Sequence, residues 1–160
     1  MVRGRFYIDL CETYVTYVKN HYGNDAIVVF DGYSSGASAK TAEQDRRATK
    51  DVVADILFEP DWKLTVKKSS FLNNRKNKDR FIKLHVTELR GNRIDAIKCI
   101  ADADCTIVHT ALTTVSYTFS DVVVAGNDTD LLGMLVAFAE RDMKIHFVIV
   151  EGSYAAIHYI

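Results

Sequence analysis

The chain has 160 residues, of which 48% are hydrophobic and 26% charged, and its formal net charge is −1 at pH 7. This composition excludes whole-chain disorder and collagen-like repeats, and the length favours one domain with a core that requires no disulfide or metal. A net charge near zero means that any nucleic-acid-binding surface must be local. Three cysteines without a CxxC pair, and no signal-peptide or membrane-spanning pattern, predict an intracellular protein of the nucleus or cytoplasm without a membrane partner.

Continuous apolar runs and helical periodicity alternate along the chain. The runs are Ala26–Phe30, Val122–Ala125 and Ile145–Val150, with a weaker candidate at Ile94–Ile100. Continuous rather than alternating apolar character indicates strands that are buried on both faces, as in a parallel sheet. Helical spacing of apolar residues predicts helices within residues 7–18, 82–89, 107–115 and 131–138.

This alternation predicts an α/β fold with a doubly wound, mainly parallel sheet flanked by helices, a Rossmann-like three-layer sandwich. We expect one domain that spans residues 1–160. The segment Leu131–Phe138 is apolar almost all round, so we expect that helix to be buried.

Acidic residues follow several of the predicted strands. Because ligands bind beyond the carboxyl ends of parallel strands, we expect these acids to lie at one edge of the sheet. Carboxylates at close range repel one another unless a cation lies between them, and hard oxygen ligands suit Mg²⁺ or Mn²⁺. The alternative interpretation of each acid is a helix N-cap or a loop residue. The five acids are Asp31, Asp102, Asp104, Asp128 and Asp130.

Three other enzyme classes fit parts of these motifs. A P-loop for ATP requires glycine where Ala39 precedes Lys40, which disfavours that class. A haloacid-dehalogenase-like phosphotransferase has a D-x-D directly after a strand, as Asp128 and Asp130 nearly do, but it also requires a lysine and an acidic pair that we do not identify. A glycosyltransferase D-x-D has the same spacing, but 160 residues is short for one.

Three strings together resemble the flap-endonuclease/PIN-like nuclease superfamily. They are VVFDG at residues 28–32, ADADC at 101–105 and NDTDLL at 127–132, in the order and spacing of that family. Residues 71–82 are also similar to transposon-associated animal members of the group. The resemblance covers roughly residues 5–150 and implies a PIN-like fold in which the five aspartates hold one or two Mg²⁺ or Mn²⁺ ions. Such ions would activate water and stabilise the leaving oxygen of a phosphodiester.

Basic residues form two groups. The resemblance implies that the first group, after the VVFDG string, contacts the scissile phosphate, and its alternative interpretation is a solvated helix face; it comprises Lys40, Arg46 and Arg47. The second group is the set of Lys and Arg within residues 63–83, which stand against a single acid, Asp79. This local excess predicts a phosphate-contacting face, with a solvated helix surface as the alternative, and it includes Arg75, Lys76, Lys78 and Arg80.

Relatives in this superfamily begin with a strand whose final Asp joins the metal cluster. The chain lacks such a strand, so the resemblance implies an N-terminally incomplete domain; Asp9 lies in a predicted helical stripe and is a poor substitute. We hypothesise a divalent-metal-dependent nuclease that hydrolyses phosphodiester bonds in DNA or RNA. Two alternatives stay open: a catalytically degenerate nucleic-acid-binding module on the same fold, and a Mg²⁺-dependent phosphatase-like enzyme. The sequence does not determine the oligomeric state.

Overall fold

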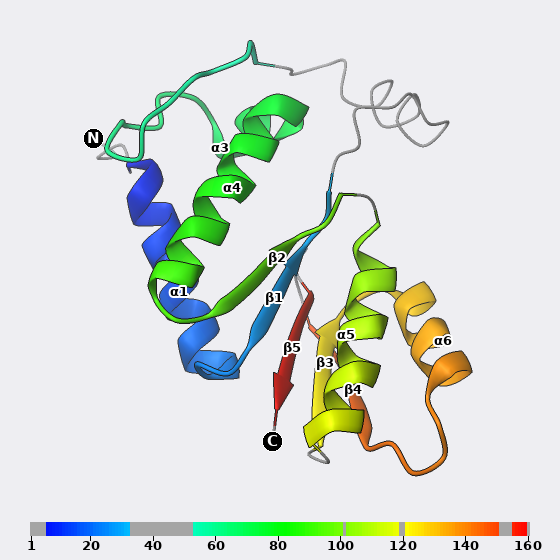
Figure 1. The fold of residues 1–160 in the computed structure, drawn as a ribbon. Helices are drawn as coiled ribbons and strands as arrows, with labels where there is room; N and C mark the ends of the chain where they lie inside the picture. Colours follow the sequence, from blue (N-terminus) through cyan, green and yellow to red (C-terminus); the bar gives the residue numbers. More distant parts are fainter. Residues whose placement is uncertain (1–5, 33–52, 101, 119–120, 151–154, 160) are drawn as a thin grey trace.

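The computed structural model describes residues 6–32, 53–100, 102–118, 121–150 and 155–159. These residues form a mixed α/β fold (Figure 1). No helix within these ranges is long and apolar enough to cross a membrane. In chain order the elements are α1 (Tyr7–Tyr22), β1 (Ile27–Phe30), α3 (Lys68–Asn73), α4 (Arg75–Gly91), β2 (Asp95–Lys98), α5 (Ala103–Thr118), β3 (Val122–Gly126), α6 (Thr129–Phe138), β4 (Ile145–Ile149) and β5 (Ala155–Tyr159).

The strands form one sheet in the order β2-β1-β5-β3-β4. β1 pairs with β2 in parallel, and β3 pairs with β4 in parallel, as predicted from the continuous apolar runs of β1, β3 and β4 and the weaker run of β2. β5 lies at the centre and runs antiparallel to both β1 and β3, so the sheet is mixed rather than mainly parallel. The difference has a physical reason: continuous apolar runs identify strands that are buried on both faces, and the sequence of β5, with Ala, Ile, His and Tyr, forms no such run.

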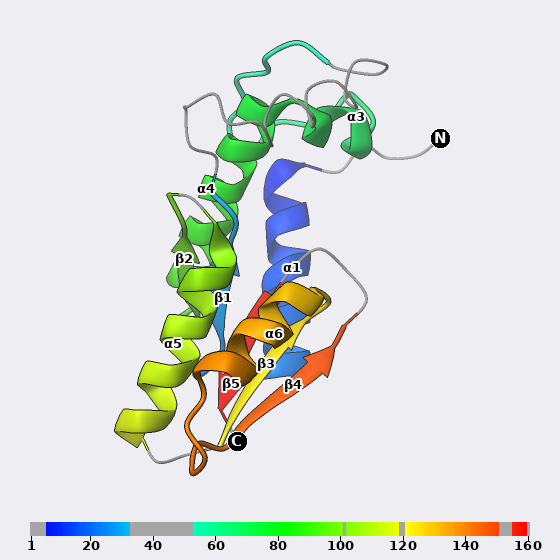
Figure 2. The same cartoon turned by 90° about the vertical axis from the view of Figure 1, so that its right-hand side faces the viewer.

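Helices pack against both faces of the sheet around β1. Val28 and Phe30 belong to a buried cluster with residues of α1 and α4, whereas Val29 belongs to a cluster with residues of α5 and α6. Successive side chains of a strand point to opposite faces, which explains this division. Figures 1 and 2 show α1 and α4 on one side of the sheet and α5 and α6 on the other.

A third cluster joins the start of α1 to α3 and α4. Tyr7 stacks on Phe58, with ring centroids 4.0 Å apart, and both rings contact Phe71 and Phe81. The turn at residues 59–62 supplies the carbonyl groups that accept the first amides of α1, since Ile8 N donates to Pro60 O at 2.8 Å. The segment of residues 53–66 therefore covers one end of the α1–α4 layer.

The expectation that α6 is buried all round is wrong. Leu131 and Leu135 point into the core, but Leu132, Val136 and Phe138 are exposed. In Figure 1, α6 (orange) is the outermost helix on its side of the sheet. Among the described residues, α6 is thus covered along one face only.

Candidate acidic site

Asp31 lies directly beyond β1, where the chain leaves the sheet. Its carboxylate accepts hydrogen bonds from the backbone amides of Gly32 and Ala103. Partial burial and the charge of Asp102 raise the pKa of Asp31, while Lys78 and the two amides act in the opposite direction. Asp31 and Asp102 therefore interact as like charges at the ends of two neighbouring strands.

Gly32 is required by the close approach of β1 and β2 at this edge. A Cβ atom at residue 32 would collide with the carbonyl group of Cys99 and lie 2.8 Å from the carbonyl carbon of Ile100. The amide of Cys99 also donates to Phe30 O at 3.0 Å, which holds the two chains together. The glycine after Asp31 thus keeps this carboxylate beside the start of α5.

Two of the other predicted acids act as helix caps. Asp102 Oδ1 accepts a hydrogen bond from Asp104 N at 3.1 Å at the start of α5. Asp128 Oδ1 accepts one from Asp130 N at 2.9 Å and is the N-cap of α6. A capping carboxylate has a second oxygen and spare lone pairs, so this role does not prevent it from binding a cation.

The five acids share one edge of the sheet but do not form one cluster. β1 and β3 run in the same direction, because each is antiparallel to β5. Asp31 and Asp128 therefore follow strand ends at the same edge, but β5 lies between them, and two strand spacings amount to roughly 9–10 Å. Within the described ranges, no three or more His, Cys, Asp or Glu side chains are grouped closely enough to hold a metal.

Two carboxylates such as those of Asp31 and Asp102 are a ligand set that would suit one hydrated Mg²⁺ or Mn²⁺ ion. Mg²⁺ keeps several water ligands and is commonly held by only one or two carboxylates. A cation between the two carboxylates would remove the repulsion that raises the pKa of Asp31. The complete set of five acids does not fit a single ion, since the described ranges hold no group of three or more such side chains that could bind one metal.

A second group of charges lies beside this pair, between α4 and β2. Asp79 forms ion pairs with Lys83, at 3.0 Å, and with Lys98. Partial burial opposes ionisation, but the hydrogen bonds from Lys98 and Lys83 lower the pKa of Asp79. The role of Lys98 was missed from the sequence, where it looked like an interruption of an apolar run.

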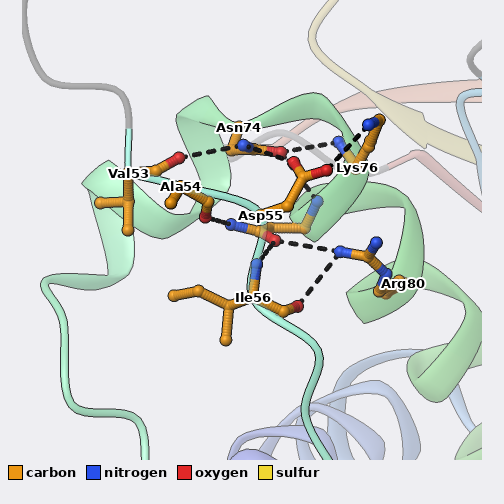
Figure 3. Close-up of polar contacts among 8 residues, drawn as sticks. Val53, Ala54, Asp55, Ile56, Asn74, Lys76 and Arg80 are labelled. Atoms are coloured by element: carbon orange, nitrogen blue, oxygen red, sulfur yellow. Dashed lines mark hydrogen bonds and ion pairs between the residues drawn. The ribbon is translucent and has the colours of Figure 1, made fainter.

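Part of the predicted basic face holds the chain together (Figure 3). Lys76 Nζ forms an ion pair with Asp55 at 2.8 Å, and Arg80 Nη1 donates to Ile56 O at 3.1 Å. Asn74 caps α4 by accepting from Lys76 N at 2.9 Å, and it also donates to Val53 O. These contacts fix residues 53–56 on the first turns of α4.

The buried amide of Asn77 completes this junction. Asn77 Oδ1 accepts from Ile56 N at 2.7 Å and Nδ2 donates to Ala54 O at 3.0 Å. Sequence reasoning missed Asn77, because an asparagine inside a charged helix looks like a solvent-exposed residue.

The other predicted basic residues lie in different parts of the chain. Arg75 and Lys78 lie on α4, and Lys78 acts electrostatically on Asp31. The side chains of Lys67 and Lys68, around the start of α3, are exposed. The predicted phosphate contacts Lys40, Arg46 and Arg47 lie outside the described residues.

Comparisons of the chain with protein-family models, curated proteins and solved structures found no match.

Proposed function

We propose that this chain is a divalent-metal-dependent nuclease domain of the PIN-like group, acting on phosphodiester bonds in DNA or RNA. The observation that carries the proposal is the interaction of Asp31 with Asp102 beyond two neighbouring parallel strands, with Lys78 close enough to act on the same carboxylate. The doubly wound, three-layer arrangement is part of the proposal. Helices on both faces of the sheet support it, and the antiparallel β5 is a departure from it.

Each residue of the pair has a definite role in this proposal. A bound Mg²⁺ or Mn²⁺ ion would lower the pKa of a water molecule and stabilise the leaving oxygen. Asp31 and Asp102 would hold the ion, and the amides of Gly32 and Ala103 orient the Asp31 carboxylate. The ammonium group of Lys78 would bind a non-bridging phosphate oxygen as a point charge.

The test is cleavage of labelled oligonucleotides: single-stranded DNA, single-stranded RNA, duplex DNA and a branched duplex, each with EDTA, Mg²⁺ or Mn²⁺. We expect cleavage that requires the ion and falls at least 100-fold in Asp31→Asn and in Asp102→Asn. Asp25→Asn is the matched control, because Asp25 is exposed and precedes β1 at the opposite end of that strand. Equal cleavage by Asp31→Asn and wild type would identify a contaminating nuclease and contradict the proposal.

A second candidate is a nucleic-acid-binding module without catalytic activity. It is favoured by one observation: the described residues contain no group of three or more His, Cys, Asp or Glu side chains that could hold a metal ion. This module would bind the same oligonucleotides in EDTA and leave them intact in Mg²⁺ and Mn²⁺. Fluorescence anisotropy in parallel with the cleavage assay separates the two functions. Hydrolysis of a small phosphomonoester without oligonucleotide cleavage would instead indicate a phosphatase.

A further inference from the structure

The two edges of the sheet differ in how their backbone is covered. At the β2 edge, Cys99 N donates to Phe30 O of β1. The backbone groups of successive residues in a strand point alternately to the two sides, so the carbonyl of Ala96 points away from β1. Arg90 covers this carbonyl with two hydrogen bonds, from Nε at 3.0 Å and Nη2 at 2.7 Å. Charged residues also flank it at Asp95 and Lys98. Such devices prevent an edge strand from pairing with another chain.

At the β4 edge no described side chain covers an outward-pointing carbonyl, and the flanking Lys144 lies 3.5 Å from Asp121. Lys144 O and Val150 N bond to β3, so the backbone groups of Ile145, Phe147 and Ile149 point outward by alternation. β4 contains no proline, lysine or acidic residue, and it is the last strand in the sheet order. A regular apolar edge strand whose outward donors and acceptors have no partner among the described residues is a template for strand addition.

Apolar side chains are exposed on β4 and on the helix above it. Ile149 is 78% exposed and Val148 47%, and on α6 Val136 is 74% exposed. Residues Leu132 and Val136 lie about 100° around the helix from the core-facing Leu131 and Leu135, so they form a lateral face. We call these exposed residues of α6 and β4 the β4-edge face.

We propose that the β4-edge face binds a second copy of this chain, with the two β4 strands antiparallel across a twofold axis at Phe147. In this register Phe147 exchanges both backbone hydrogen bonds with the partner's Phe147, and Ile145 does the same with the partner's Ile149. All outward-pointing backbone groups of β4 are then paired, and the exposed Ile149 packs on the partner's Ile145. The result is a continuous sheet of two copies.

The helices fit the same arrangement. α6 packs over β3 and β4, because Leu131 and Leu135 share a cluster with Val122, and Phe147 packs against it. Two copies of α6 over the joined sheet are therefore about two strand spacings apart, roughly 9.6 Å, and packed helices have interaxial distances of about 8–10 Å. The lateral face of α6 would thus meet its counterpart as the strands pair. This contact provides the burial that the apolar sequence of α6 predicts and that the described residues of a single chain do not supply.

Charge and size indicate a second copy that binds weakly. Asp121, beside β4, lies 3.5 Å from Lys144 and 3.4 Å from His146, so this acid already has basic neighbours in the same chain when the strands pair. The ten residues of α6 and five of β4 are fewer than the roughly 20–30 residues per side of a standard stable interface. We therefore expect a reversible dimer with a Kd on the order of 10–100 µM.

Sedimentation equilibrium of the whole chain between about 1 and 200 µM tests the dimer across the range set by that Kd. We expect the average mass to rise from monomer towards dimer, and Ile149→Lys and Val136→Lys each to weaken association at least tenfold. Leu57→Lys is the control, because Leu57 is 72% exposed on the segment of residues 53–66, away from the β4-edge face. Circular dichroism melts establish that each variant folds. A wild type that stays monomeric at 200 µM, or two folded variants that associate like wild type, would overturn the proposal.

Cross-linking tests the register. His146 and the partner's Val148 form a non-hydrogen-bonded pair in this dimer, with Cα atoms about 4.5 Å apart, which a disulfide spans. In a Cys105→Ser background, which removes the exposed native thiol, His146→Cys and Val148→Cys chains are oxidised separately and as a mixture. We expect the disulfide-linked dimer chiefly in the mixture. Equal yields in the separate chains would contradict this register.

Discussion

Removing the amide of Asn77 should detach residues 53–56 from α4. The Asn77 side chain is fully buried, and it joins α4 to both Ile56 N and Ala54 O. Asn77→Ala leaves these two backbone groups without a partner, and Arg80 loses one of its acceptors. The change therefore tests whether this junction holds the basic residues of α4 in place.

The cost can be worked out from the lost contacts. A buried group left without its hydrogen bond costs about 1–3 kcal/mol, and Ile56 and Ala54 are partly reached by solvent, so about 2–4 kcal/mol is expected in total. For a chain of this size, each kcal/mol shifts Tm by about 2–4 °C. We therefore expect Tm to fall by about 4–16 °C.

The single tryptophan allows the unfolding of one segment to be followed separately from the unfolding of the whole protein. Trp62 lies in the segment of residues 53–66, so its fluorescence reports that segment while far-UV circular dichroism reports the helices. We expect urea to shift the fluorescence transition of Asn77→Ala below its circular dichroism transition. Asn20→Ala is the control, because Asn20 is exposed on α1. A loss of less than 0.5 kcal/mol in Asn77→Ala would refute the reasoning.

Four further outcomes are expected. Gly32→Ala should lower the free energy of unfolding by about 1–3 kcal/mol in urea, since its Cβ has no space, and an unchanged midpoint would show that β1 and β2 separate freely. Burial and a neighbouring carboxylate raise the pKa of Asp31, so its contribution to stability is present below its ordinary pKa and is lost as pH rises through the raised value. Asp31→Asn should therefore melt above wild type at pH 7, with the difference vanishing towards pH 3. Asp31→Asn should also abolish any rise of Tm on adding millimolar Mn²⁺, whereas Asp130→Asn should retain it, because β5 separates the two acids. Joint replacement of Lys67 and Lys68 by Glu should weaken binding to single-stranded nucleic acid and reduce the salt slope by about 0.7 per lost contact without lowering Tm.

Much of the fold could be predicted from the sequence because burial imposes a pattern on it. The run Ala26–Phe30 became β1, and the stripe at residues 7–18 became the buried face of α1. β5 was missed, since its short sequence of Ala, Ile, His and Tyr has no strong apolar run. The error at α6 has a different origin. An apolar pattern predicts that a helix surface is buried, but it does not indicate whether residues of the same chain bury it.

The sequence predicted which residues belong to the candidate site, but not how their side chains are arranged. Asp31 and Asp102 were identified from their positions after strands, and in the structure the charge of Asp102 raises the pKa of Asp31. The partners of the basic face were not predictable, because Asp55 and the carbonyl of Ile56 come from a segment about 20 residues away in the chain. Pairing across such a distance depends on tertiary packing, which local spacing does not encode.

Strand order limits how the acids can cooperate. Had β3 followed β1 directly in the sheet, Asp31 and Asp128 would lie about one strand spacing apart, roughly 4.8 Å, within reach of a common ion with Mg–O distances near 2.1 Å. β5 doubles this separation. Two ions about 3.5–4 Å apart with a phosphate between them could still connect acids at roughly 9–10 Å, whereas one ion could not. The position of β5 therefore means that Asp31 and Asp128 would act together only with more than one ion or with substrate phosphate between them.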